Sequence, residues 1–214
     1  MSRATSEQHG DVRRLVLDAA IKIIETTGAE SLSMREVARQ AGVSHQAPYH
    51  YFKDRSGIFA AISEEGFTAL ANAFKSVRQQ GTGSGEVAAK AGLIAYLRFA
   101  RESTGHFRVM FRSDICGVST HEATGAASEE AFNELLEMVA QTIGASINPT
   151  DAMTFALMLW SNAHGLATLV VDGPLARKLP PEANLETQLM DVINLSAHMV
   201  ALQAAEMGLV PAGQ

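Results

Sequence analysis

The stretch 33–52 constrains the fold of this 214-residue chain more than any other. Ser33 stands three residues before Glu36, the spacing of a capping box, and this predicts that a helix begins after Ser33. Gly42 predicts the end of that helix, because glycine readily adopts the left-handed conformation needed there. Ser44 then predicts the cap of a second helix. Two short helices joined by so tight a turn have the geometry of a helix-turn-helix.

The second predicted helix is polar and has little apolar surface to bury. It carries side chains that can donate to phosphates or base edges, namely His45, Gln46, Tyr49 and His50. The alternative is an ordinary hairpin of two helices in a helical protein. A short polar helix held on another helix is more simply explained as a presented surface, which favours DNA recognition.

Residues 11–70 resemble the N-terminal domain of the tetracycline-repressor (TetR) family of transcriptional regulators. The resemblance is carried, in order, by Ser31–Ala38, Ala41–Ser44, Tyr49–Phe52 and Asp54–Ile58. The chain departs from the family pattern at Pro48, where an aliphatic residue is usual, and at Arg55, where lysine is usual. A proline in the first turn of a helix is tolerable, because the N–H that it lacks would be unpaired there.

The resemblance implies a palindromic operator in double-stranded DNA as the partner, and it implies roles for individual residues. His45, Gln46 and Ala47 are expected at base edges, and Ser33, Ser44, Tyr49 and Arg55 at phosphates. Arg35 and His50 complete the predicted DNA-binding set.

The net charge of −6 is unusual for a DNA-binding protein, but the acidic residues are unevenly distributed. Residues 1–58 hold eight Lys and Arg against seven Asp and Glu, whereas residues 59–214 hold nine against sixteen. A weakly basic DNA-binding part implies modest non-specific affinity, with more of the binding left to positioned contacts.

Hydrophobic periodicity predicts an all-α protein of about nine helices, without a β pattern. We expect a three-helix DNA-binding domain over 11–71 and a helical ligand-binding and dimerisation domain over 80–208. A long helix from Asp54 to about Gln79 should link the two, with Gly57 and Gly66 inside it allowing a bend or close packing. The other expected helices cover 11–27, 86–103, 127–143, 150–171 and 184–207, with a short element at 105–112 and a loop at 114–125.

A second resemblance lies in the C-terminal part. His106–Phe111 and Trp160–Leu166 look like the ligand-binding domain of a TetR subgroup with a Trp…His-Gly signature. It implies a small-molecule effector, with candidate ligand-binding residues Phe99, Phe107, Met110, Phe111, Met138, Trp160 and His164. Each of these is alternatively plain core, and His164 alternatively donates to a backbone carbonyl or to a nearby Ser or Asn.

The resemblance also implies a homodimer in which the last two helices pair with those of a second subunit, here 150–171 and 184–207. The helix over 150–171 is apolar on nearly all sides and so needs cover on all sides. In the last helix we expect Leu189 and Ile193 on the shared face.

Enzymatic, metal and membrane functions find little support. His121-Glu122 lacks a second histidine four residues on, and we expect no catalytic residue, metal or cofactor. The single cysteine, Cys116, excludes an internal disulfide and fits a reducing cytoplasm. Polar residues interrupt the apolar run 152–171, so we expect no membrane span.

These patterns together predict a cytoplasmic, ligand-responsive repressor that releases its operator on binding a small, apolar molecule. The alternative is a ligand-binding or interaction protein of the same fold that does not read DNA.

Overall fold

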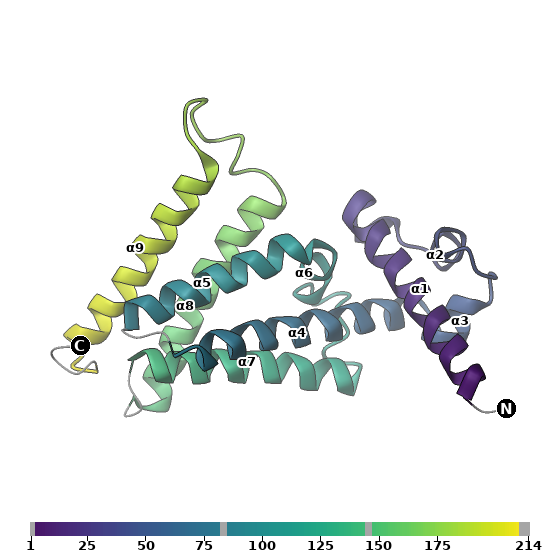
Figure 1. The fold of residues 1–214 in the computed structure, drawn as a ribbon, viewed down its shortest axis with the longest axis horizontal. Coiled ribbons are helices and arrows are strands. Elements are labelled where there is room, and N and C mark those ends of the chain that lie inside the picture. The colour runs from purple at the N-terminus through teal and green to yellow at the C-terminus, as the bar shows by residue number, and fades with distance from the viewer. Residues whose placement is uncertain (1–2, 82–84, 144–146, 210–214) are drawn as a thin grey trace. The chain divides into compact units, whose positions relative to one another are not determined.

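The computed structural model describes residues 3–81, 85–143 and 147–209 (Figure 1). Within them the chain forms nine α-helices and one short 3-10 helix, which confirms the predicted all-α class. In chain order these are α1 (Arg3–Thr27), η1 (Ala29–Ser31), α2 (Met34–Ala41), α3 (Ala47–Phe52), α4 (Arg55–Gln79), α5 (Gly85–Glu102), α6 (Thr104–Met110), α7 (Glu122–Ile143), α8 (Pro149–Val171) and α9 (Leu185–Glu206).

Three helix starts differ from the expectation by more than one residue, those of α1, α3 and α7. α1 begins at Arg3 rather than at residue 11, and α7 begins at Glu122, inside the predicted loop 114–125. The early turns of α7 are rich in small residues that give a weak periodic signal, yet Ala127 and Thr124 are buried. Tertiary packing therefore extends this helix beyond what its pattern indicates.

The helices divide into two units. The first unit holds the chain up to Thr68 together with Ser103–Ser128, and the second holds Ala69–Glu102 and the chain from Glu129 onward. Both α4 and α7 run without a break from one unit into the other. α4 is thus continuous between the two units, as predicted, and α7 is a second helix that is continuous between them.

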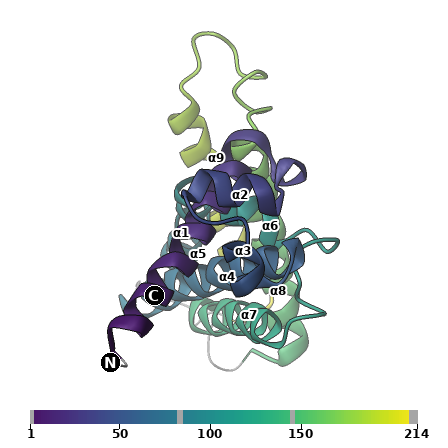
Figure 2. The same cartoon turned by 90° about the vertical axis from the view of Figure 1, so that its right-hand side faces the viewer.

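The core of the first unit forms where α1, α2, α3 and the start of α4 meet (Figure 2). Val16, Leu17 and Ile24 of α1 are completely buried there. Leu32 and Val37, which flank the start of α2 as a hydrophobic staple would, lie in the same core. The guanidinium of Arg13 lies 5.1 Å from the centre of the Phe52 ring, which ties α1 to α3.

The segment 103–128 is anchored to this first unit by polar contacts as well as by apolar ones. Arg108 donates to the backbone oxygen of Glu25 at 3.0 Å, and Arg112 forms an ion pair with Glu30. The hydroxyl of Thr124 donates to the backbone oxygen of Ala60 at 3.1 Å. α6 and the first turns of α7 therefore belong structurally with the helix-turn-helix.

The second unit is built around α5, which packs against both α8 and α9 (Figure 1). α8 starts as predicted, with the side chain of Asn148 accepting from the N–H of Asp151 at 3.0 Å and Pro149 in the first turn. α9 likewise starts as predicted, with Asn184 accepting from the N–H of Thr187 at 3.0 Å.

α8 and α9 bury one side within the second unit and leave large apolar side chains exposed on the other. Leu189 and Ile193 are each only 1% exposed, so our assignment of them to a shared face between subunits is wrong. They pack into the subunit's own core because α9 turns that stripe toward α5. The exposed apolar residues are Met153, Leu157, Met158 and Leu169 of α8 and Met190, Val192, Leu195, Met199 and Leu202 of α9.

Among the described helices, α8 alone is long and apolar enough to cross a membrane, by length and composition only, and 28% of its most apolar window is buried. The core helix of a soluble protein can meet the same test, so the length and composition of α8 are weak evidence for a membrane span.

Candidate functional sites

The helix-turn-helix is held by the local interactions that its sequence specifies. The hydroxyl of Ser33 accepts from the N–H of Glu36 at 3.3 Å, which confirms the predicted cap. The Glu36 carboxylate accepts from the guanidinium of Arg39, with Nε at 2.9 Å, rather than completing a capping box. Gly42 ends α2 in the left-handed conformation with φ 67°, as expected. These contacts fix the direction in which the chain leaves α2.

α3 starts later than predicted, and Ser44 does not cap it. The helix begins at Ala47 after Gln46, and the N–H of Ala47 donates to the backbone oxygen of Ser44 at 3.0 Å within a turn. The cause is Pro48. A helix capped by Ser44 would require an N–H on residue 48 to bond the oxygen of Ser44, and proline has none. Starting two residues later places Pro48 in the first turn, where this loss carries no penalty.

Almost all of the predicted DNA-binding side chains are exposed, although they come from three short segments. Tyr49 is 50% exposed, while its neighbours Pro48 and Phe52 are buried and anchor the helix. His45, from the turn, lines the same shallow hollow as Ser33 and Arg35, from the start of α2. Ala47 is half-buried, and the exposed members are Ser33, Arg35, Ser44, His45, Gln46, Tyr49, His50 and Arg55.

The side chain of Arg55 already makes two contacts inside the first unit. Its guanidinium donates to the backbone oxygen of Ala29 at 2.7 Å and lies 4.9 Å from the centre of the Phe59 ring. A guanidinium has five N–H donors, so these contacts orient the group and leave capacity for a phosphate. The predicted phosphate contact of Arg55 stays a prediction.

The predicted ligand-binding residues are divided between the two units. Phe107, Met110 and Phe111 belong to the first unit, where Phe111 lies edge-on to Phe107 and to Phe67. The other four, Phe99, Met138, Trp160 and His164, belong to the second. The predicted set therefore does not form one site within a single unit.

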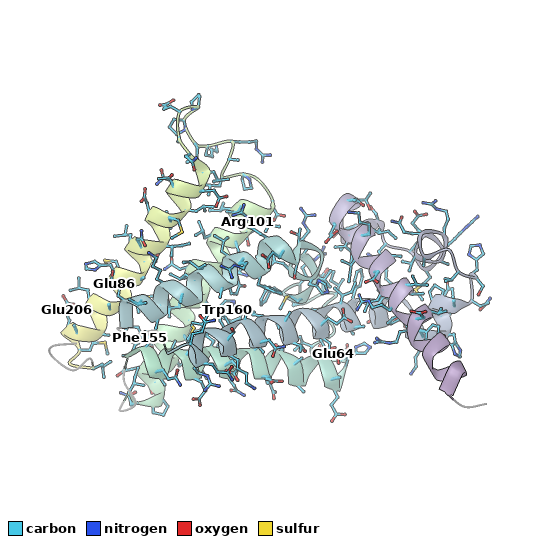
Figure 3. All side chains as sticks on the ribbon, viewed as in Figure 1. Glu64, Glu86, Arg101, Phe155, Trp160 and Glu206 are labelled. Atoms are coloured by element: carbon cyan, nitrogen blue, oxygen red, sulfur yellow. The ribbon has the colours of Figure 1, made fainter. Side chains whose placement is uncertain are left out.

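Met138 and Trp160 line a small cavity in the second unit; Figure 3 labels Trp160. Its volume is about 10 Å³, close to the minimum needed for one water molecule. Sequence reasoning missed the other lining residues, which are Phe74, Gly92, Leu93, Tyr96, Leu135, Leu159 and Ala163. Nothing in a helical apolar stripe distinguishes a cavity wall from core.

A short chain of hydrogen bonds joins α8 to α5 beside this cavity. Trp160 and His164 stand one turn apart on α8 and both reach the hydroxyl of Tyr96, which lies 2.8 Å from Nδ1 of His164. Trp160 can only donate, so the hydroxyl accepts from it, and the direction of the hydrogen bond between Tyr96 and His164 follows the tautomer of His164. His164 thus has Tyr96 as a side-chain partner.

Burial sets the protonation states of this chain of hydrogen bonds. Burial raises the pKa of Tyr96 well above its ordinary value, an effect that the hydrogen bond from Trp160 opposes. Burial also lowers the pKa of His164 below its ordinary value of 6.5. Both groups are therefore neutral near pH 7.

In the part of the chain that the structure describes, three or more His, Cys, Asp or Glu side chains do not come together in a way that could hold a metal ion. Cys116 is a buried free thiol.

Both parts of the chain match domains of known regulators. Residues 16–62 match the bacterial regulatory proteins of the tetR family, and residues 89–192 match the tetracyclin repressor-like C-terminal domain. The HTH-type transcriptional regulator AcrR of Shigella flexneri is 38% identical over 64 residues, which are 30% of this chain and 30% of that protein.

Two further relatives are similar over more of the chain. An uncharacterized HTH-type transcriptional regulator of Haemophilus influenzae is 28% identical over 143 residues, which are 65% of this chain and 69% of that protein. A solved structure from Rhodococcus sp. RHA1, described as a protein with unknown function, is 26% identical with a TM-score of 0.70. That match covers 90% of this chain and 94% of the other.

Proposed function

The chain belongs to the tetracycline-repressor family of bacterial regulatory proteins, and from this premise we propose that it is a ligand-responsive transcriptional repressor. The observation that carries the proposal is the capped helix-turn-helix at 33–52, which exposes a set of polar side chains that includes His45, Gln46 and Tyr49. Exposed donors on a rigidly held short helix suit phosphates and base edges of a major groove. The protein would act in the cytoplasm, without catalysis or a cofactor.

The proposed repressor is a homodimer that pairs α8 and α9 with their counterparts in a second copy. Leu195 is 63% exposed and Met199 is 55% exposed, and they lie on the apolar face that both helices leave uncovered. Contiguous exposed apolar surface of this kind marks an interaction site. A second copy would also bring two helix-turn-helix motifs to successive half-sites of a palindrome, about 34–36 Å apart.

Glycine at position 165 supports such a helix pairing. Gly165 lies on the exposed side of α8, and a Cβ placed there would have nothing within 4 Å. Glycine within a helix costs about 1 kcal/mol relative to alanine, and packing inside the subunit offers no reason for it. Close approach of a helix from a second copy is a reason.

Selection of bound fragments from a random DNA pool tests the proposal. The full-length chain should enrich a two-fold symmetric sequence whose half-sites are separated by one helical turn or a multiple of it. Failure to enrich any sequence at low salt, by a protein shown to be folded and dimeric, would instead favour a ligand-binding or interaction protein that does not read DNA.

A further inference from the structure

Met138 occupies an unusual position in the wall of the second unit's cavity. Its side chain is 3% exposed and reaches from α7 to α5 at Gly92. A Cβ on residue 92 would lie 2.6 Å from Cε and 2.8 Å from Sδ of Met138, closer than real Cβ contacts permit. The thioether therefore lies directly on the α5 backbone, and the glycine makes that position possible.

The chemistry of the cavity wall is uniform. The side chains of Phe74, Leu93, Leu135, Leu159 and Ala163 are apolar, and Gly92 contributes only backbone. The polar groups of Tyr96 and Trp160 are already hydrogen-bonded to each other. A charged group brought into this wall would lose its hydration without meeting an opposite charge, which is strongly unfavourable.

We propose that the effector binds in this cavity by displacing the Met138 side chain from Gly92, and that it is an uncharged, apolar molecule. This proposal rests on the ligand-responsive function proposed above. Methionine is suited to the role because its three rotatable bonds let it leave one packed position for another. The present volume of about 10 Å³ admits no organic molecule, so an effector needs the space that Met138 fills.

Displacement of Met138 can influence the helix-turn-helix through the chain itself. Met138 lies on α7, whose first turns belong to the first unit and are held to α4 by the bond from Thr124 to Ala60. An effector shifts an equilibrium only by its differential affinity for the two arrangements. Here the arrangement that it favours is the one with Met138 withdrawn.

The test uses full-length protein with two probes that differ by one charge, toluene and benzoate. Met138→Ala vacates the space and should let toluene raise the thermal unfolding midpoint by several degrees, because a vacated apolar cavity binds aromatic hydrocarbons. Met138→Leu is the matched control, since it keeps the space filled and should respond little. Benzoate should stabilise neither variant. Met138→Val, which removes fewer atoms, replaces the alanine variant should that fail to fold.

The second readout is affinity for DNA selected by the wild-type chain. Toluene should weaken operator binding by Met138→Ala on the order of tenfold and leave Met138→Leu unaffected. Equal stabilisation of both variants by toluene, stabilisation by benzoate, or toluene binding without a change in operator affinity would each overturn the proposal. Should the chain bind no DNA at all, the proposed repressor function fails, whereas the toluene arm still decides whether this cavity takes neutral ligands.

Discussion

The hydroxyl oxygen of Tyr96 lies 2.8 Å from Nδ1 of His164, and this contact connects α5 with α8 beside the cavity lined by Met138 and Trp160. Burial of His164 favours its neutral imidazole over the charged form. Trp160 and His164 of α8 share the hydroxyl of Tyr96. In this unit α5 packs against α9 as extensively as against α8.

Stability should accordingly depend on pH through His164. Burial lowers its pKa in the folded chain below 6.5, so below that pH the unfolded chain binds a proton that the folded chain does not. The free energy of unfolding should therefore fall as pH is lowered from about 7.5 to about 5. His164→Gln stays neutral throughout, and its urea unfolding should lose less stability over the same interval. Parallel losses in both proteins would contradict this role.

Gly57 and Gly66 should respond differently to alanine. A Cβ on Gly57 would lie 2.1 Å from the backbone oxygen of Phe52, which cannot move without shifting α3. Gly57→Ala should lower the free energy of unfolding by about 2 kcal/mol despite its better helix propensity. A Cβ on Gly66 would meet Sδ of Met110 at 2.9 Å, the end of a flexible side chain.

Gly66→Ala should consequently change stability by less than about 1 kcal/mol, since propensity gain and packing cost oppose each other. Urea unfolding of both variants checks the pair. Equal effects would show that contact with Phe52 does not set the cost at position 57. In both places glycine serves close packing, which is one of the two roles that we expected, and the helix need not bend.

A charge on the exposed face of α9 should separate the proposed dimer while each subunit stays folded. Leu195→Asp places the carboxylate where the side chain is 63% exposed, so it is desolvated only when a second copy covers it. Analytical ultracentrifugation should show a monomer with wild-type helical content. Leu189→Asp is the contrast, because position 189 is 1% exposed and the subunit itself should unfold. A dimeric Leu195→Asp protein would place the interface elsewhere.

Tyr49→Phe should weaken binding to every DNA sequence by a similar factor. Its hydroxyl is proposed to donate to a phosphate, which carries no base information, and one such hydrogen bond contributes about 1 kcal/mol. In titrations, the affinity of the variant for the selected operator and its affinity for unrelated DNA should fall by about the same factor. A change of preferred base at one position would mean that Tyr49 reads sequence.

Local chemistry made much of the first unit predictable. Ser33 and Gly42 act within a few residues of themselves, and both helix boundaries that they predict are present. The start of α3 was missed because the prediction weighed Ser44 as a cap and overlooked that Pro48 would then lack a needed N–H. That signal was present in the sequence.

Other features depend on packing that no local pattern contains. An apolar stripe shows that Leu189 and Ile193 are buried, but not whether α5 or a second subunit covers them. Likewise, Arg108, Arg112 and Thr124 bind partners many positions away, so the membership of 103–128 in the first unit could not be read from the chain order. The contact between Gly92 and Met138 also joins positions that lie far apart in the chain, so no local pattern predicts it.

The central claim is that the stretch 33–52 reads DNA sequence, and Gln46→Ala tests it most directly. The measurement is the ratio of affinities for the selected operator and for unrelated DNA, in wild type and variant, at one salt concentration. An exposed glutamine at a base edge contributes about 1–3 kcal/mol of discrimination, so the ratio should fall about 5- to 150-fold while non-specific affinity stays the same. An unchanged ratio, or an equal loss on both DNAs, would contradict the assignment of this turn and helix as the sequence reader.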